Sequence, residues 1–199
     1  MAQLDVEVFV RRVFTDSWDL FKRDPALYIL AGLVVVVLGA VTLGLLAGPL
    51  MVGFVQLVRE RRRGVPRAVG DLFGGLSGRW LSALLLTLVV AVGVVLGSML
   101  LVLPGLVVAF VAMYAYQVLA YRGAGVGESL TGSYHLVRDQ LGPSLVLFLL
   151  LAVLNTIGGA VIFGSLLTLP FTLVALTVAF EELTRLPPVT SVAREPEPL

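Results

Sequence analysis

Three long apolar stretches without a charged side chain alternate with shorter charged segments along this chain of 199 residues. The uncharged runs cover 25–58, 80–121 and 140–180. As a helix the central run would be about 63 Å long, roughly twice the thickness of the hydrocarbon core of a bilayer. It is therefore expected to cross a membrane twice as a helical hairpin, with its turn near Gly97 and Pro104, where the apolar run is interrupted.

The two outer runs follow the same plan. In the first, a break between Gly44 and Pro49 predicts one helix over 25–46 and a second over 49–62. This run is short for two crossings, and the sequence leaves open whether its hairpin spans the bilayer fully or stops partway. In the third run, a glycine-rich segment followed by Pro170 predicts two more helices. The expected fold is an all-α integral membrane protein with six transmembrane helices as three hairpins, whose breaks are marked by Pro49, Pro104 and Pro170.

An amphipathic segment precedes each hairpin. In 4–23, apolar residues that include Trp18 and Phe21 recur at helical spacing, opposite a face of charged side chains. One interpretation is an interfacial helix with these aromatic side chains at the depth of lipid headgroups. The other is that the apolar stripe packs under the helix bundle. Shorter stripes follow at 65–77, where Phe73 is a further candidate for interface contact, and at 126–140, where the apolar stripe comprises Val126, Leu130, Tyr134 and Val137.

The order of amphipathic segment, helix, break and helix recurs three times. It divides a single membrane domain at 1–185 into units of about 4–64, 65–125 and 126–185. Asp24 and Pro25 have the residue types of an N-cap and a first helical position, so they are expected to start the first hairpin. Pairs of small residues four apart precede the breaks and predict close helix approach, at Gly44 and Gly48, Gly93 and Gly97, and Ala160 and Gly164. Residues 186–199 predict a flexible cytoplasmic tail.

Composition and charge strengthen the membrane interpretation. The chain is 58% hydrophobic, above the roughly 45–50% of soluble domains, and none of its 14 Lys and Arg or 13 Asp and Glu residues lies in a hairpin bend. Six crossings place all charged segments on one face, and the excess of Arg near the spans makes that face cytoplasmic. We therefore expect a multi-pass protein of the bacterial cytoplasmic (inner) membrane with both termini in the cytoplasm.

The most basic stretch follows the second predicted helix. At this position beside a span, contact with anionic phospholipid is favoured over nucleic-acid binding. No nucleic acid is expected as a partner. The arginines of this stretch are Arg59, Arg61, Arg62, Arg63 and Arg67.

The uncharged runs offer little for catalysis. Proton relays and ion coupling inside membranes use ionisable side chains, and the three runs contain none. The absence of Cys and the single His135 argue against disulfides and against thiolate or multi-histidine metal sites. No phosphate-binding loop, dinucleotide fingerprint or nucleophile elbow is found either. We therefore expect no enzymatic activity and no cofactor.

Two polar features remain to be explained. Gln117 and Asn155 carry amides that need partners when buried. They either line a small polar cavity or, as we favour, each pin one pair of helices. Glu181 and Glu182 close the last predicted helix and are expected to form interfacial salt bridges with arginines of the basic connector rather than a catalytic carboxylate pair.

Short motifs over nearly the whole chain, from about Phe14 to Thr184, give it a family resemblance. It resembles a group of uncharacterised bacterial six-helix integral membrane proteins, which includes the membrane domain fused to glycerophosphodiester phosphodiesterases. The catalytic domain of the fused relatives is separate and absent here, so the resemblance implies an accessory role in the membrane and no catalytic residue. The motifs lie at 48–53, 71–76, 103–105, 127–130, 154–158 and 169–171.

Two functions from different classes are compatible with these features. The leading hypothesis is a non-enzymatic membrane protein that organises lipids, or scaffolds a protein partner or a second copy of itself, through its amphipathic segments and basic face. The alternative is a small transporter or permease, with a midplane site where proline-broken helices expose backbone carbonyls. Its weakness is the lack of charge in the spans.

Overall fold

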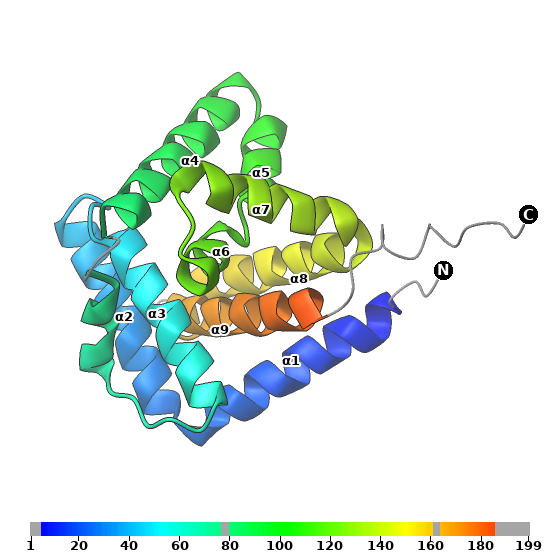
Figure 1. The fold of residues 1–199 in the computed structure, drawn as a ribbon. Helices are drawn as coiled ribbons and strands as arrows, with labels where there is room; N and C mark the ends of the chain where they lie inside the picture. Colours follow the sequence, from blue (N-terminus) through cyan, green and yellow to red (C-terminus); the bar gives the residue numbers. More distant parts are fainter. Residues whose placement is uncertain (1–4, 77–79, 161–163, 186–199) are drawn as a thin grey trace, which may run out of the picture.

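The computed structural model describes residues 5–76, 80–160 and 164–185, and every regular element in these ranges is a helix. The predicted tail at 186–199 lies outside them. The all-helical class is confirmed. In chain order the elements are α1 (Val6–Arg23), α2 (Pro25–Val41), α3 (Ala47–Arg62), the 3-10 helix η1 (Val69–Leu76), α4 (Trp80–Leu100), α5 (Val102–Val111), α6 (Ala115–Arg122), α7 (Val126–Asp139), α8 (Leu141–Ala160) and α9 (Gly164–Arg185) (Figure 1).

Four segments are long and apolar enough to cross a membrane: α4, α5 with α6 as Leu103–Arg122, α8 and α9. A fifth candidate is the pair α1 and α2, which meet at an angle of 97°. Helices α2 and α3 have 17 and 16 residues, so each is about 25 Å long and shorter than the hydrocarbon core. The structure thus gives four to five candidate spans, fewer than the six predicted.

The bend between α1 and α2 is built as the sequence predicts. Asp24 caps α2 by accepting a hydrogen bond from the backbone N–H of Leu27 at 3.3 Å, and Pro25 occupies the first turn. Helix α1 then turns away and packs along α8 and α9, where Phe9 and Val13 are buried. Most of its apolar stripe therefore packs against the helix bundle, the second of the two interpretations.

The three prolines do not play the same role. Pro49 and Pro104 are each the third residue of a helix, α3 and α5, that follows a break, where a missing N–H costs nothing. The prediction of a break at Pro170 is wrong, because α9 continues through it. A transmembrane helix tolerates an internal proline when neighbouring helices support it. The ring of Pro170 packs tightly on Gly32 of α2: a Cβ added to Gly32 would lie 2.5 Å from the Cγ of Pro170.

A break that the sequence did not predict lies inside the candidate span Leu103–Arg122. The chain leaves helical geometry at 112–114, between α5 and α6. The buried Ser133 of α7 repairs this gap: its Oγ donates to the carbonyl of Val111 at 2.6 Å and accepts from the N–H of Tyr114 at 3.1 Å. No glycine or proline marks this position, so the sequence carries no local signal for it.

Helix α7 turns most of its predicted apolar stripe toward the protein. Of that stripe, Val137 is buried, Val126 and Leu130 are partly buried against the core, and Tyr134 is exposed, while Ser129 and Ser133 are fully buried. Small side chains allow this close packing: a Cβ on Gly132 would lie 3.0 Å from Val118 of α6. Hydrogen bonding at the helix break thus adds to apolar burial in setting which face of α7 turns inward.

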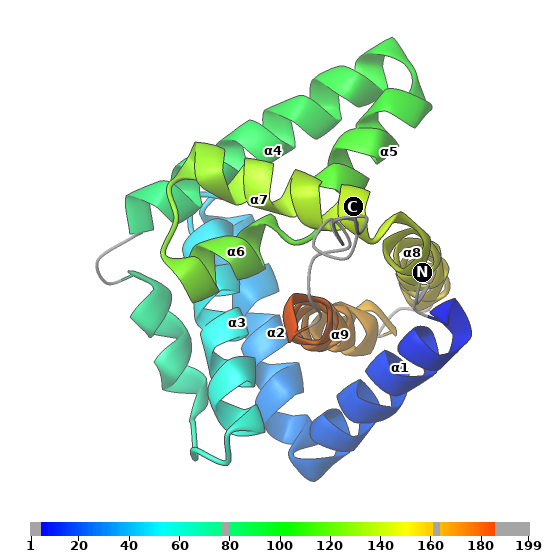
Figure 2. The same cartoon turned by 45° about the vertical axis from the view of Figure 1, so that its right-hand side comes forward.

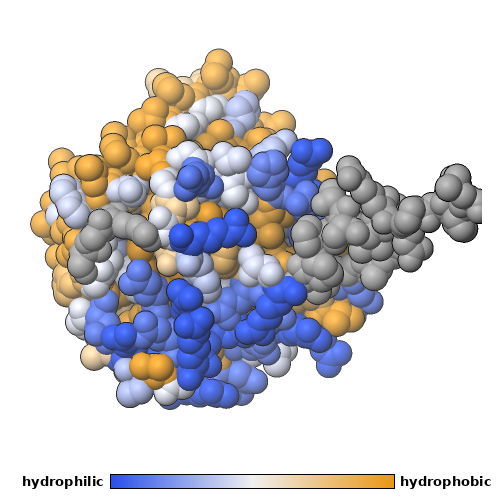
Figure 3. Space-filling model, in the orientation of Figure 1, coloured by the Kyte–Doolittle hydropathy of each residue, from blue (hydrophilic) through white to orange (hydrophobic). Residues whose placement is uncertain are grey.

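Helices α4 and α5 pack on one another and extend beyond the remaining helices (Figures 1 and 2). They touch where two glycines meet, because a Cβ on Gly97 would lie 2.7 Å from the backbone nitrogen of Gly105. The outer faces of both helices carry exposed apolar side chains. Figure 3 shows hydrophobic residues over the upper part of the molecule, where these helices lie, and hydrophilic residues over the lower part.

Candidate functional site

The best-defined polar site lies where helices α3, α6 and α9 end close together and α1 runs beside them. Arg62 ends α3, Tyr121 lies in the last turn of α6, and Glu181 lies in the last two turns of α9. Basic residues at the C-terminus of a helix are stabilised by its dipole. The sequence therefore places its arginines where the helix ends favour them.

Ion pairs connect α1, α3 and α9 at this end. Arg62 lies 2.7 Å from Glu181, 3.7 Å from Glu182 and 3.5 Å from Asp16 of α1. Arg12 of α1 reaches Glu182 at 3.7 Å, and Arg185 pairs with both glutamates. The expected pairing of the two glutamates with the basic connector is confirmed. We call this set the interhelix ion network; its members are Arg12, Asp16, Arg62, Glu181, Glu182 and Arg185.

The formal charges of the interhelix ion network cancel, with three arginines and three carboxylates. The side chains of Arg62, Glu181 and Glu182 are only 16%, 13% and 14% exposed. Ion pairs in such a partly buried position are screened less than surface pairs. The network therefore fixes how α1 sits on α3 and α9.

Tyr121 extends the network to α6. Its hydroxyl donates a short hydrogen bond to the carboxylate of Glu181. The guanidinium carbon of Arg59 lies 4.4 Å from the centre of the Tyr121 ring, a cation–π geometry. Three helices thus meet at Glu181: α3 through Arg62, α6 through Tyr121, and its own helix α9.

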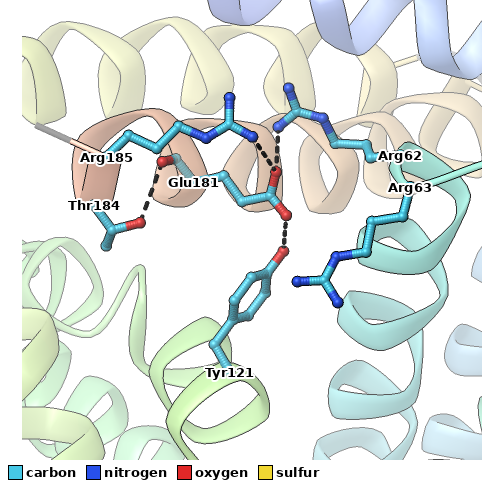
Figure 4. Close-up of a pocket in the computed structure, with 6 residues that line it drawn as sticks. All are labelled: Arg62, Arg63, Tyr121, Glu181, Thr184 and Arg185. Atoms are coloured by element: carbon cyan, nitrogen blue, oxygen red, sulfur yellow. Dashed lines mark hydrogen bonds and ion pairs between the residues drawn. The ribbon is translucent and has the colours of Figure 1, made fainter.

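Beside the network is a hollow of about 330 Å³, lined by Arg62, Arg63, Tyr121, Glu181, Thr184 and Arg185 (Figure 4). In Figure 4 the guanidinium of Arg63 points toward Tyr121, and no dashed line joins it to another residue drawn. Within the described ranges, no ion pair or hydrogen bond involves the Arg63 side chain. The hollow therefore has one uncompensated positive charge at its rim.

The other predicted lipid-contact arginines are engaged within the protein. Arg61 forms a short ion pair with Asp24, and Arg67 pairs with Glu60 and, at 3.4 Å, with Asp71. The hydrogen bond to Glu60 raises the pKa of Arg67 above its usual value. Two of the predicted set therefore neutralise acidic residues of the same chain.

The three aromatic residues predicted to contact lipid divide into exposed and buried. Trp18 is 54% exposed and Phe73 is 45% exposed. Phe21 is only 3% exposed and packs against Phe171 of α9 with ring centres 6.0 Å apart. Its side chain has no surface to offer a lipid, because α1 turns that face toward α9.

The two amides serve different helix pairs. Asn155 of α8 donates to the hydroxyl of Thr172 of α9 and to its own backbone at Leu151, both at 2.8 Å. Gln117 is buried in α6, which packs chiefly on α3 and α7, and its Oε1 accepts no hydrogen bond. The structure does not join them in a shared hydrogen-bond network. Asn155 pins a pair of helices, as favoured from the sequence.

The described residues offer little for a metal site or for a substrate site of a transporter. In the part of the chain that the structure describes, no three His, Asp or Glu side chains cluster in a way that could hold a metal ion. The break at 112–114 exposes the kind of backbone atoms that a midplane substrate site uses. Ser133 already bonds those atoms on both sides of the break.

Sequence reasoning missed five residues of the site: Arg12, Asp16, Tyr121, Thr184 and Arg185. Asp16 lies on the polar face of the predicted helix at 4–23, and Tyr121 is the last residue of the central uncharged run. Their positions in or next to charged segments are the only signals in the sequence that they belong to the site. Neither pattern identifies the residue that each one meets across the bundle.

The comparisons with known proteins leave the family open. The resemblance to six-helix membrane proteins therefore stays a prediction from short motifs. Searches against protein-family models, curated proteins and solved structures found no significant match for this chain.

Proposed function

We propose that this chain is a non-enzymatic multi-pass protein of the bacterial cytoplasmic membrane that organises anionic lipid around one end of its helix bundle. This charged end is the one that carries the interhelix ion network. The proposal includes six crossings, with α2 and α3 as short spans, and both termini in the cytoplasm. The observation that carries it is the interhelix ion network, which ties amphipathic helix α1 to the ends of α3 and α9.

The shape of α1 supports an interfacial position. It meets α2 at 97°, so if α2 crosses the bilayer, α1 lies nearly parallel to the membrane surface. Its inner face packs on the spans, while Trp18 remains exposed beside Phe171, with ring centres 6.3 Å apart. Tryptophan is enriched at the depth of lipid headgroups because its ring is amphipathic. Helix α1 therefore has a protein face and a lipid face.

The ion pairs support a structural role for the carboxylates. A general acid or base must exchange a proton with a substrate. Glu181 instead pairs with arginines of α3 and α9, and Glu182 with arginines of α1, α3 and α9. The chemistry that the site offers best is electrostatic attraction of an anion, which matches the anionic lipids of a cytoplasmic leaflet.

Lipid retention tests this proposal. The double variant Trp18→Ser with Phe73→Ser removes two exposed aromatic side chains of the amphipathic segments, and we expect it to retain less than about half as much phospholipid as the unmodified protein. The measurement is phospholipid phosphorus per protein after mild detergent extraction. The matched control, Met99→Ser with Leu100→Ser, changes two exposed apolar residues at the far end of α4.

Two outcomes would contradict lipid organisation. Retention that equals that of the unmodified protein would show that the exposed aromatic residues hold no lipid. An equal loss in the control would show that exposed apolar side chains in general hold the lipid. A protein partner or a second copy recovered in place of lipid would replace lipid organisation with scaffolding.

A further inference from the structure

We infer that the hollow beside the interhelix ion network is a binding site for one phosphate group, held by Arg63 at its rim. This inference deepens the proposed function and rests on it, because it names the lipid chemistry that the charged end selects. The ligand is a phosphate group with a net negative charge. It belongs either to an anionic lipid headgroup, as a diester, or to a soluble phosphate.

Charge balance is the first argument. The carboxylates in and around the hollow already have ion-pair partners: Glu181 lies 2.7 Å from Arg62 and also accepts a hydrogen bond from Tyr121, and Glu182 lies 3.2 Å from Arg185. Arg63 is left with no partner among the described residues, and its guanidinium is directed at the hollow in Figure 4. An anion placed there would meet one unpaired arginine rather than a neutral surface.

The shape of the guanidinium is the second argument. Arginine presents parallel N–H donors that match two oxygens of a phosphate, and such charge-assisted hydrogen bonds are about twice as strong as neutral ones. Arg185 lines the same hollow, and its side chain is 66% exposed. Its guanidinium has further N–H groups that can donate to the same anion. The volume of about 330 Å³ is at the small end of ligand pockets, which suits one headgroup.

The depth of the site is the third argument. The hollow lies among the ends of α3, α6 and α9, and the last two are candidate spans. Phosphate groups of lipids lie at the level where spans leave the hydrocarbon core.

The experiment counts bound lipids by native mass spectrometry of the full chain in phosphatidylcholine nanodiscs that contain a minor fraction of phosphatidylglycerol. We expect Arg63→Gln to bind phosphatidylglycerol about tenfold more weakly than the unmodified protein, since a hydrogen bond to a charged group contributes about 1.5–3 kcal/mol and 1.4 kcal/mol is tenfold. Arg63→Lys should recover part of the affinity. The matched control is Arg138→Gln, an equal change of charge at an exposed position of α7.

A second arm distinguishes the two sources of phosphate. Inorganic phosphate that binds in pure phosphatidylcholine nanodiscs, and is lost in Arg63→Gln, assigns the site to a soluble phosphate. Phosphatidylglycerol that binds while inorganic phosphate does not assigns it to a headgroup. Either result supports the site. Unchanged binding in Arg63→Gln, or an equal loss in Arg138→Gln, would overturn it.

Failure of this inference is separable from failure of the proposed function. If Arg63→Gln binds phosphatidylglycerol normally while the Trp18 and Phe73 variant still loses lipid, the hollow is not the site but lipid organisation stands. If neither variant changes bound lipid, both proposals fail.

Discussion

At the scale of single residues, Ser133 shows how one side chain can hold together a broken helix. Its hydroxyl bonds Val111 and Tyr114 on the two sides of the gap between α5 and α6, where neither group has a helical partner. In hydrocarbon no water can replace these bonds. The closely placed Ser129, in the same helix and equally buried, has an Oγ with no hydrogen-bond partner.

The two serines therefore predict opposite results. Ser133→Ala should lower the free energy of unfolding by about 1–3 kcal/mol, because it leaves a buried N–H and a buried carbonyl unpaired. Ser129→Ala should leave it unchanged or raise it slightly, since it removes an unsatisfied hydroxyl. Unfolding of both variants in the same detergent measures the difference. Equal effects would contradict the role of Ser133.

The sequence predicted that glutamates of the last helix form ion pairs with arginines of the basic stretch. It did not predict which arginine pairs with which carboxylate. The sequence predicts that Glu181 faces an arginine, because uncompensated charge at the end of a span is costly. It could not tell that Arg62 pairs with Glu181 while Arg61 pairs with Asp24 and Arg63 pairs with none of the described residues. Those choices depend on the directions of neighbouring side chains at the end of α3, which only packing sets.

At the scale of elements, periodicity and small residues predicted most helices, and close packing explains the exceptions. The predicted second helix at 49–62 agrees with α3, and the turn near Gly97 and Pro104 agrees with the gap between α4 and α5. The first helix ends at Val41 rather than at 46, because the chain enters left-handed geometry at Leu43 and Gly44. Pro170 and the break at 112–114 escaped prediction because neighbouring helices decide both.

The meeting of α4 and α5 gives a prediction at this scale. Gly97→Ala places a Cβ within 2.7 Å of Gly105, so the helices must separate, and we expect a loss of about 1–3 kcal/mol of stability. The control is Gly159→Ala in α8, where a Cβ meets no atom within 4 Å. Melting temperatures in detergent should fall for the first variant and hold or rise for the second. An unchanged melting temperature for Gly97→Ala would show that the two helices do not need this contact.

At the scale of the whole molecule, charge and apolar surface are separated. The ion pairs gather at the ends of α3 and α9, whereas the turns before α3 and after α4 carry exposed leucines, including Leu45 and Leu101. The sequence predicted this separation, because its charged segments and uncharged bends alternate regularly. It could not predict the hollow, which forms only when α3, α6 and α9 end beside one another.

The proposed function depends on the charged end and the apolar turns lying on opposite faces of the bilayer. The chain has no cysteine, so single cysteines can report their side without background. The measurement is labelling of Val65→Cys, Leu45→Cys and Leu101→Cys by a membrane-impermeant maleimide, in intact cells and in inverted membranes. We predict that the first reacts only in inverted membranes and the other two only in intact cells. Turn cysteines that react from the same side as Val65→Cys, or from neither side, would contradict six crossings.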